Sequence, residues 1–496
     1  MDTAKWHRGA LIVLFALFVV VNAAYLHRMP GLLGDEASEG ENVYLLLDAK
    51  QIIITGERSY IGPLLDYVRI PFVLLFGYDA LALRVLMLVF SAATFWLAVI
   101  VCRRLWGDDV GLVAATALLF SPMYITYQRL GWAITLFPFF AFSILYFFTL
   151  PEKSRLVRWA PLLAGLAGGL AVHNHVLFLP TLVGVIVGWA VALLLRRQWR
   201  KVAAAWLAIV GFWAGFGTQF AVMLLNKNDF RDALQATDLY ADRVRELPEA
   251  LPMLLSGSSY VAHYTGTEFA PLTIQGISLT LAGLALAALI VPTRRRSSWS
   301  WLLGLAALLA ILLYMVFQFS LRYFVTFALG VWALAGAGLA SMVARLFRER
   351  LPSWPALLAV PLGTGLSVWM VLVLFWPFLI SGGKVGEFSV GRRTDNAAAF
   401  VDTRPLVACL AGAGPVYSEN VHIHNRLRYL SYDSESGLDV VAENESKKRA
   451  MWIVSYRVAG EDQPSREATA GKGTSQAAFE KCPDLRHFKV IARDRG

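Results

Sequence analysis

Residues 81–102 read LALRVLMLVFSAATFWLAVIVC and are followed directly by Arg103-Arg104. A helix needs roughly 20 apolar residues to cross a hydrocarbon core of about 30 Å. This run therefore predicts a transmembrane helix. The arginines predict that it ends in the cytoplasm, because short cytoplasmic loops are enriched in Lys and Arg.

The composition of the whole chain agrees with a membrane protein. Of its 496 residues, 57% are hydrophobic and 16% are charged, whereas soluble domains are about a quarter charged. The net charge of +10 comes from Lys and Arg that cluster between apolar runs. This placement is typical of cytoplasmic anchors and argues against nucleic acid as a partner.

Apolar runs recur along residues 1–380 and predict a mainly α, polytopic helix bundle. We expect about eleven spans, near residues 10–26, 81–102, 110–127, 132–150, 157–172, 176–195, 203–225, 274–292, 300–318, 322–343 and 356–380. The first run resembles a signal peptide, but Tyr25-Leu26-His27-Arg28 offers no small-residue cleavage site. An uncleaved helix with a cytoplasmic N-terminus is therefore the better interpretation.

The distribution of cations supports this count, because every predicted inner loop carries at least two Lys or Arg residues. The odd count places the C-terminus outside, together with loops 27–80 and 226–273, and we expect the protein in the cell membrane. The cations of the inner loops are Arg103-Arg104, Lys153/Arg155/Arg158, Arg196-Arg197 with Arg200-Lys201, Arg294-Arg295-Arg296 and Arg345/Arg348/Arg350.

Residues 381–496 differ from the bundle, with short apolar runs and mixed charges. Residues 415–417 and 451–456 predict strands, and 396–410 predict a helix. We expect a small extracytoplasmic α/β domain. Cys409 and Cys482 would be bridged there or remain two separate buried thiols.

The first outer loop contains the adjacent carboxylates Asp35 and Glu36. Like charges side by side favour a nearby cation, metal or proton. Residues 38–54 have helical spacing, and the pattern ends at Gly56. The alternative interpretation is that the two acids only cap this helix at its positive end.

An ordered set of residues starts at this pair and continues along the outer side of the chain. It comprises Asp35-Glu36, Gly56, Pro63 to Tyr67, Phe76-Gly77 and Arg84, followed by Ser121-Pro122, Gln128-Arg129 and Arg322-Tyr323. The set resembles the GT-C glycosyltransferases, and most of all the branch of protein O-mannosyltransferases and lipid A aminoarabinose transferases. The resemblance implies transfer of a sugar from a polyprenyl-phosphate donor to a glycan, lipid or protein acceptor on the extracytoplasmic face.

The chain departs from the family pattern at two places. The family often has a second acid after Arg129, but residues 129–138 read RLGWAITLFP. Many members have a Lys after the fifth span, where this chain has His173 and His175. These departures leave the subfamily and the metal dependence open.

The resemblance and the required chemistry suggest roles for particular residues. Asp35 matches the family's base, and Glu36 would orient it or hold a divalent metal with histidine. An Arg fork can grip phosphate, although Arg also snorkels to lipid headgroups. The expected phosphate and donor residues are Arg129, Arg322, Tyr323, His173 and His175, and the expected metal ligands are Glu36, His173, His175 and His263.

Substrate contacts are expected from further outer residues. Tyr60, Tyr67, Trp132 and Tyr264 could stack on a sugar, but aromatic residues also form interfacial belts. His263 and Glu268 are candidates in loop 226–273, and Glu268 could replace the second carboxylate.

Two rival functions are a transporter or flippase for a lipid-linked sugar, and a non-catalytic receptor. Transporters place ionisable residues near the middle of the bilayer. Here the polar residues gather at one face, which favours an enzyme.

Overall fold

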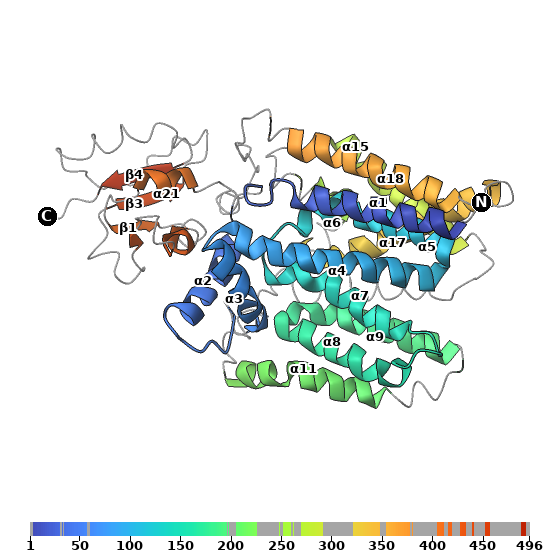
Figure 1. Ribbon diagram of the computed structural model, residues 1–496, viewed down its shortest axis with the longest axis horizontal. Coiled ribbons are helices and arrows are strands. Elements are labelled where there is room, and N and C mark those ends of the chain that lie inside the picture. Colours follow the sequence, from blue (N-terminus) through green and yellow to red (C-terminus); the bar gives the residue numbers. More distant parts are fainter. Residues whose placement is uncertain are drawn as a thin grey trace.

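The structure of the protein is a computed structural model that describes most of the helix bundle and parts of the C-terminal region. The described residues are 3–29, 32, 34–56, 60–195, 197, 205–225, 248, 251–258, 261, 269–290, 321–347, 354–376, 379, 404–410, 415–418, 427–432, 439–440, 452–456 and 488–492. Long helices form a bundle, and a small sheet lies beyond one end of it (Figure 1).

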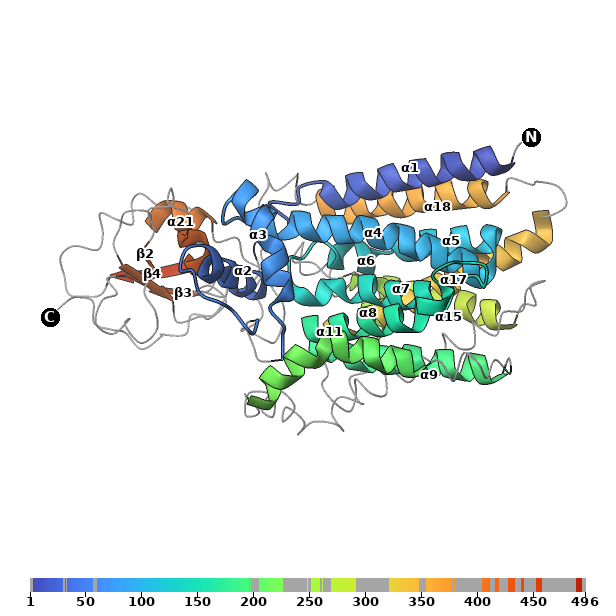
Figure 2. The same cartoon turned by 60° about the horizontal axis from the view of Figure 1, so that its bottom comes forward.

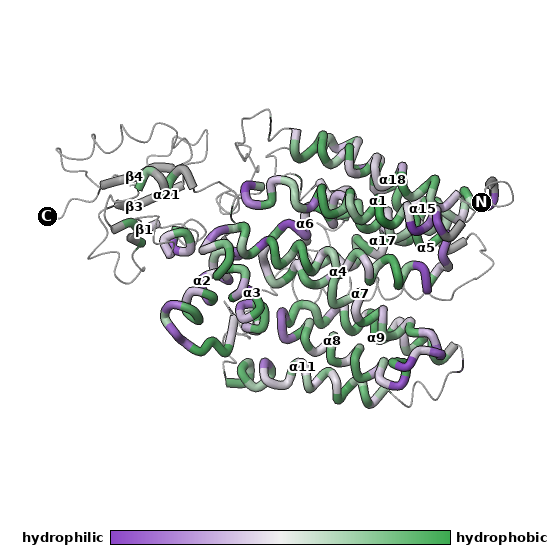
Figure 3. Tube along the Cα trace, in the orientation of Figure 1, coloured by the Kyte–Doolittle hydropathy of each residue, from purple (hydrophilic) through white to green (hydrophobic). Residues whose placement is uncertain are grey.

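The predicted helical bundle is confirmed in its main features. Figure 3 shows hydrophobic residues along most of the length of its helices, with hydrophilic stretches near their ends. The long helices are α1 (Thr3–Ala23), α4 (Ala80–Trp106), α5 (Asp108–Leu119), α7 (Phe137–Phe148), α8 (Ala160–Asn174), α9 (Leu179–Leu195), α11 (Trp206–Leu225), α15 (Pro271–Ile290), α17 (Val325–Phe347) and α18 (Trp354–Met370), which a π-helical turn continues to Phe375.

Six of the described helices are long and apolar enough to cross a membrane. They include residues of α1, α4, α11, α15, α17 and α18. The shorter apolar helices Ala133–Phe148 and Val176–Val191 coincide with two more predicted spans. The predicted span 300–318 lies outside the described residues, so the total of eleven stays a prediction.

The predicted span 110–127 is not one continuous helix. It consists of α5 and the short helix α6 (Pro122–Tyr127), with a break at Phe120 and Ser121. Pro122 lacks an N–H and disfavours a helical conformation in the residue before it. The Ser121 hydroxyl then accepts a hydrogen bond from the N–H of Tyr124 and caps the new helix.

Glycine allows α8 and α11 to pack closely. A Cβ atom at Gly165 would lie 2.7 Å from the Cα of Ala208, and one at Gly211 would lie 2.8 Å from the backbone nitrogen of Leu166. Small residues that let two backbones approach are the usual basis of helix association in membranes.

The first outer loop contains two helices, α2 (Gly34–Leu47) and α3 (Leu64–Phe76). The sequence predicted a helix over 38–54, whereas α2 begins four residues earlier and ends seven earlier. Lys50, with φ of +51°, has left-handed backbone geometry just beyond its end. Because of the earlier start, Asp35 and Glu36 lie in the first helical turn.

Four strands form one sheet in the C-terminal region, in the order β2-β1-β3-β4. They are β1 (Pro415–Ser418), β2 (Asp439–Val440), β3 (Trp452–Tyr456) and β4 (Phe488–Ala492), and only β3 and β4 pair antiparallel. The predicted strands at 415–417 and 451–456 are therefore confirmed, and α21 (Arg404–Leu410) matches the described part of the predicted helix.

The sheet, α2 and α3 lie at the same end of the bundle, opposite the N-terminus (Figures 1 and 2). Cys409 in α21 is disulfide-bonded, whereas Cys102 in α4 is a buried free thiol. Cys482, which the sequence offers as the partner of Cys409, lies outside the described residues.

Candidate active site

The two neighbouring acids of the first loop have different environments. Glu36 is fully buried, whereas Asp35 is partly exposed. Arg84, near the start of α4, donates from Nε and Nη2 to the two Glu36 oxygens over 3.0 and 2.6 Å. Its Nη1 donates to the carbonyl of Leu26 over 3.0 Å. Arg84 therefore joins α2 and α4 to the chain that leaves α1.

The geometry does not fit a metal site centred on Glu36. Both of its oxygens accept from Arg84, and Oε1 also accepts from the N–H of Gly131. Within the part of the chain that the structure describes, no three His, Cys, Asp or Glu side chains gather as metal ligands would. The expected ligand His263 lies outside that part. A carboxylate held this way positions α2, and a metal there would have to displace a buried cation.

A second buried network, which the sequence did not reveal, lies beside the first. Arg69 of α3 contacts Glu39 of α2 over 2.6 Å and Asp66 over 3.0 Å, and Asn42 donates to Asp66 over 2.8 Å. Burial, together with the negative charge of Glu39, raises the pKa of Asp66 to about 7. Burial also raises the pKa of Glu39, and the negative charge of Asp35 adds to that effect. The spacing of Asp66 and Arg69, one helical turn apart, was the signal that could have indicated this pair.

Both networks meet at the turn that follows Arg129. Gly131 donates its N–H to Glu36, and its carbonyl accepts from Arg69 over 2.6 Å. A Cβ at Gly131 would lie 2.8 Å from the Cβ of Leu83, so only glycine fits this close approach. The backbone of Gly131 thus hydrogen-bonds to Glu36 of α2 and to Arg69, the partner of Glu39. In the family pattern this turn often carries a second carboxylate.

The same turn links α2 to the histidine turn after α8. The N–H of Ala133 donates to Glu39 over 2.9 Å, and the carbonyl of Ala133 accepts from Asn174 over 2.8 Å. One residue therefore connects the acidic helix to the segment that carries His173 and His175.

Arg129, an expected phosphate residue, is bonded to backbone groups of the chain itself. Its side chain is fully buried, and its terminal nitrogens donate to four backbone carbonyls in the last turn of α1 and in the segment that follows it, over 2.5 to 3.2 Å. Helix ends leave such carbonyls without intrahelical partners. These bonds give the guanidinium a structural role at the end of α1, and its expected role at the phosphate stays a prediction. The accepting residues are Val21, Asn22, Ala24 and Met29.

Three predicted site residues do come together. The ring of His175 lies 5.6 Å from that of Tyr60 and 5.7 Å from that of Tyr323, and Phe137 packs against both His175 and Tyr323. The Nδ1 atom of His175 accepts from the N–H of Leu177 over 3.2 Å. These rings come from the first loop and from the ends of three bundle segments.

The remaining predicted residues are placed as follows. His173 packs against Gly62, where a Cβ would lie 2.6 Å from its Nε2. Tyr67 is exposed and donates its hydroxyl to the carbonyl of Ile53 over 3.0 Å. Trp132 is buried. The described residues do not include three further candidates, His263, Tyr264 and Glu268. Only the backbone of Arg322 is described.

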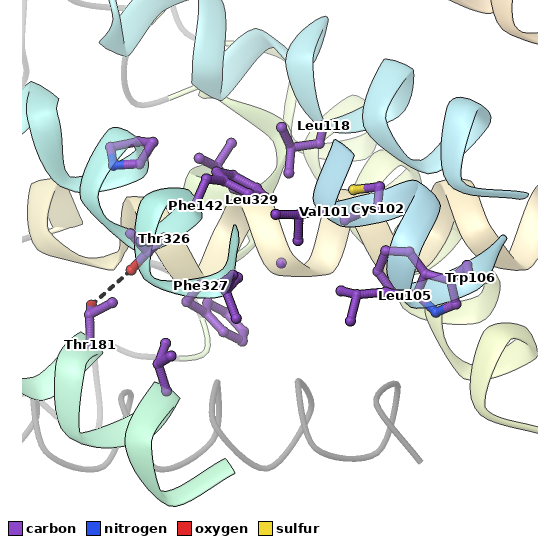
Figure 4. Close-up of a pocket in the computed structure, with 16 residues that line it drawn as sticks. Val101, Cys102, Leu105, Trp106, Leu118, Phe142, Thr181, Thr326, Phe327 and Leu329 are labelled. Atoms are coloured by element: carbon purple, nitrogen blue, oxygen red, sulfur yellow. Dashed lines mark hydrogen bonds between the residues drawn. The ribbon is translucent and has the colours of Figure 1, made fainter. Parts of the chain in front are cut away.

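A cavity of about 90 Å³ lies inside the bundle. Figure 4 shows its apolar lining, with Cys102 near Trp106 and the hydroxyls of Thr181 and Thr326 hydrogen-bonded at 2.9 Å. The described residues that line it include no predicted site residue.

The chain is similar to known membrane glycosyltransferases. Residues 61–222 match the family model described as dolichyl-phosphate-mannose-protein mannosyltransferase. The structure of ArnT from Cupriavidus metallidurans bound to undecaprenyl phosphate matches with a TM-score of 0.55 and 15% identity, covering 90% of this chain and 93% of that one. The apo structure of the same protein matches with a TM-score of 0.56 and 15% identity, covering 92% and 93%. Among curated proteins, no sequence matches the chain.

Proposed function

We propose that the chain belongs to the GT-C glycosyltransferase superfamily, in the branch of the protein mannosyltransferases and ArnT, and that it transfers a sugar from a polyprenyl phosphate to an acceptor, with Asp35 as the base. The observation that carries the assignment is the contrast among four acids of the first loop. Glu36, Glu39 and Asp66 are buried and bonded to arginine, while Asp35 at the start of α2 is partly exposed. The buried three hold the loop together, and of these four acids Asp35 is the one exposed enough to meet a substrate.

In this reaction Asp35 has to be correctly placed to accept one proton. Its carboxylate accepts the proton of an acceptor hydroxyl while that oxygen bonds to the anomeric carbon. The bond between that carbon and the phosphate oxygen breaks, and polyprenyl phosphate leaves with an added negative charge. Donors aimed at that phosphate stabilise the transition state.

The aromatic cluster supports a position for the departing phosphate. Tyr323 and His175 can both donate hydrogen bonds, and Arg322 precedes Tyr323 in the same short helix (Leu321–Phe324). We assign these three to the phosphate and Tyr60 to the sugar. His173 and Tyr67 flank this region, and Glu268 and His263 stay candidates for the acceptor.

The donor is proposed from the relatives. The matching structure of ArnT contains undecaprenyl phosphate, and the family model names a dolichyl-phosphate sugar. Both are polyprenyl phosphates, and a chain with several apolar spans offers such lipids a route from the bilayer. Glycans, lipids and proteins are all candidate acceptors.

We place the site on the extracytoplasmic side of the cell membrane, with eleven spans and residues 381–496 as an α/β domain there. The N-terminus and Arg103-Arg104 share one end of the bundle, and the first loop and the sheet lie at the other. Arginines at the first end favour the cytoplasm. The disulfide at Cys409 supports an oxidising compartment for the second.

The test is Asp35→Asn in purified protein reconstituted in nanodiscs. A panel of undecaprenyl-phosphate-linked sugars is supplied with lipid A, envelope glycans and envelope proteins, and released undecaprenyl phosphate is measured by mass spectrometry. Loss of a general base lowers turnover by about 10²–10⁴-fold, and the variant should keep the wild-type melting temperature. Asp109→Asn is the matched control, because Asp109 lies at the other end of the bundle, at the start of α5. Undiminished turnover by Asp35→Asn would remove this residue from the mechanism.

A transporter of lipid-linked sugar is the second candidate, favoured only by the number of apolar helices. In proteoliposomes it would move the donor across the bilayer intact, without releasing the free lipid phosphate. Release of undecaprenyl phosphate that depends on an acceptor decides for the transferase.

A further inference from the structure

A short segment of the C-terminal region, residues 427–432, packs directly on α2. Tyr429 at its centre is fully buried, and its ring packs with Leu32, Ala37 and Leu83. The Tyr429 hydroxyl donates to the carbonyl of Asp79 over 3.3 Å, across 350 positions of sequence. A buried aromatic ring contributes a large apolar contact, and its hydroxyl needs the partner that it finds here.

The ring of Tyr429 packs directly against Gly40 of α2. A Cβ at Gly40 would lie 2.7 Å from Cδ2 and 2.9 Å from Cζ of Tyr429. Glycine in the middle of a helix costs about 1 kcal/mol relative to alanine. The close approach of the ring is the structural reason for glycine at this position.

Two further contacts extend the interface along α2. The guanidinium of Arg428 lies 2.9 Å from the Glu41 carboxylate. The rings of Tyr432 and Tyr44 stack at 3.7 Å with 2° between their planes, and Tyr78 packs edge-on against both. The Tyr78 hydroxyl donates to Asp48, just beyond the end of α2. The segment therefore touches α2 over about two turns.

The contacts divide α2 into two faces at helical spacing. Residues 37, 40, 41 and 44 meet the C-terminal segment, while Glu36 and Glu39 point to arginines of α4 and α3. Residues three and four apart share a side of a helix. Helix α2, which carries Asp35 in its first turn, is thus held by the bundle on one face and by the C-terminal segment on the other.

We propose that Tyr429 is a positioning residue, which locks α2 from its second face and so fixes where Asp35 meets the substrate. The inference rests on the proposed function in taking Asp35 as the base; the docking of Tyr429 on Gly40 does not. Placement of a catalytic group matters steeply, because a displacement of about 1 Å can cost about 10²-fold in rate. The C-terminal region then takes part in catalysis without supplying a group to the reaction.

Three variants test the docking and its consequence: Tyr429→Ala, Gly40→Ala and the double variant. Each single change should lower kcat by about 10- to 100-fold, with less than about threefold change in KM for the donor, since an inaccurately placed base affects the chemical step. The substrate is the undecaprenyl-phosphate sugar that gives the highest wild-type turnover. The double variant should be no slower than Tyr429→Ala, because removing the ring removes the clash with the added Cβ. Additive losses would overturn the inference.

Hydrogen exchange gives a readout that does not depend on the substrate. Amides of α2, residues 34–47, should exchange faster in both single variants, while those of α5, at the other end of the bundle, keep wild-type rates. Tyr429→Phe keeps the ring and should retain wild-type exchange and most of the turnover. Gly9→Ala is the control, since a Cβ there meets nothing within 4 Å.

The two measurements separate failure of the inference from failure of the proposed function. Unchanged exchange in α2 overturns the docking. Faster exchange with wild-type kcat overturns the positioning role and leaves Asp35 as the base. If the wild-type protein releases no lipid phosphate from any donor, the proposed function fails and the positioning role fails with it, whereas the exchange data still decide the docking.

Discussion

The ion pair between Glu36 and Arg84 gives the most direct test of how the first loop is built. Both side chains are fully buried, and the pair is closed by two hydrogen bonds of 3.0 and 2.6 Å. Glu36→Gln leaves the guanidinium of Arg84 buried without its counter-charge. Breaking a buried pair in this way costs about 3–5 kcal/mol, so the free energy of unfolding should fall by that amount.

The assay is equilibrium unfolding in mixed micelles with increasing sodium dodecyl sulfate, followed by circular dichroism. Arg84→Met should cost a similar amount, and the double variant should cost less than the sum by at least about 1 kcal/mol. Arg103 and Asp108 offer a matched exposed pair at 2.7 Å, for which Asp108→Asn should cost only about 0–1 kcal/mol.

The result that would refute this reasoning is a Glu36→Gln variant as stable as Asp108→Asn. If such a variant were also inactive, Glu36 would be a catalytic residue, as the sequence first indicated. A large loss of stability in each single variant, with a double variant that costs less than their sum, would establish the structural role.

Three further predictions concern other parts of the chain. Burial raises the pKa of Asp66 to about 7, so the native state keeps a proton that the unfolded chain loses above about pH 4. Wild-type stability should therefore fall as the pH rises from 5 to 8, and Asp66→Asn should show a smaller fall; an equal fall would contradict the assignment. Gly165→Ala should lower stability by about 1–3 kcal/mol through overpacking, whereas Gly217→Ala, where a Cβ meets nothing within 4 Å, should be neutral or stabilising; equal effects would refute close packing there. A membrane-impermeant maleimide should leave buried Cys102 unmodified and should label Cys409 in intact cells only after reduction; labelling without reductant would contradict the disulfide.

Local sequence patterns predicted much of the bundle. Apolar length alone predicted helices at 81–102 and 203–225, and α4 and α11 lie there. The Ser121-Pro122 pair also indicates the break between α5 and α6. The mean hydropathy of the whole apolar run does not reveal it, because it averages over the residues on both sides. Hydropathy and capping act within a few residues, which is why a sequence reveals them.

The candidate site was predicted only in part. Tyr60, His175 and Tyr323 meet as expected, because each lies at an outer helix end or in the first loop. Arg129 does not join them, since it bonds the end of α1. An arginine at a helix end looks the same in sequence whether it faces a phosphate or a set of carbonyls.

The sequence by itself determined that this protein has several membrane-spanning helices and which loop carries the acids. Only the tertiary structure decided that Glu36, Glu39 and Asp66 are buried and paired with arginine and that Asp35 stays partly exposed. It also decided that Tyr429 meets Gly40, almost four hundred residues away. Apolar length and helical spacing are properties of neighbouring residues, whereas the partner of a buried charge or ring depends on which distant segments the fold brings together.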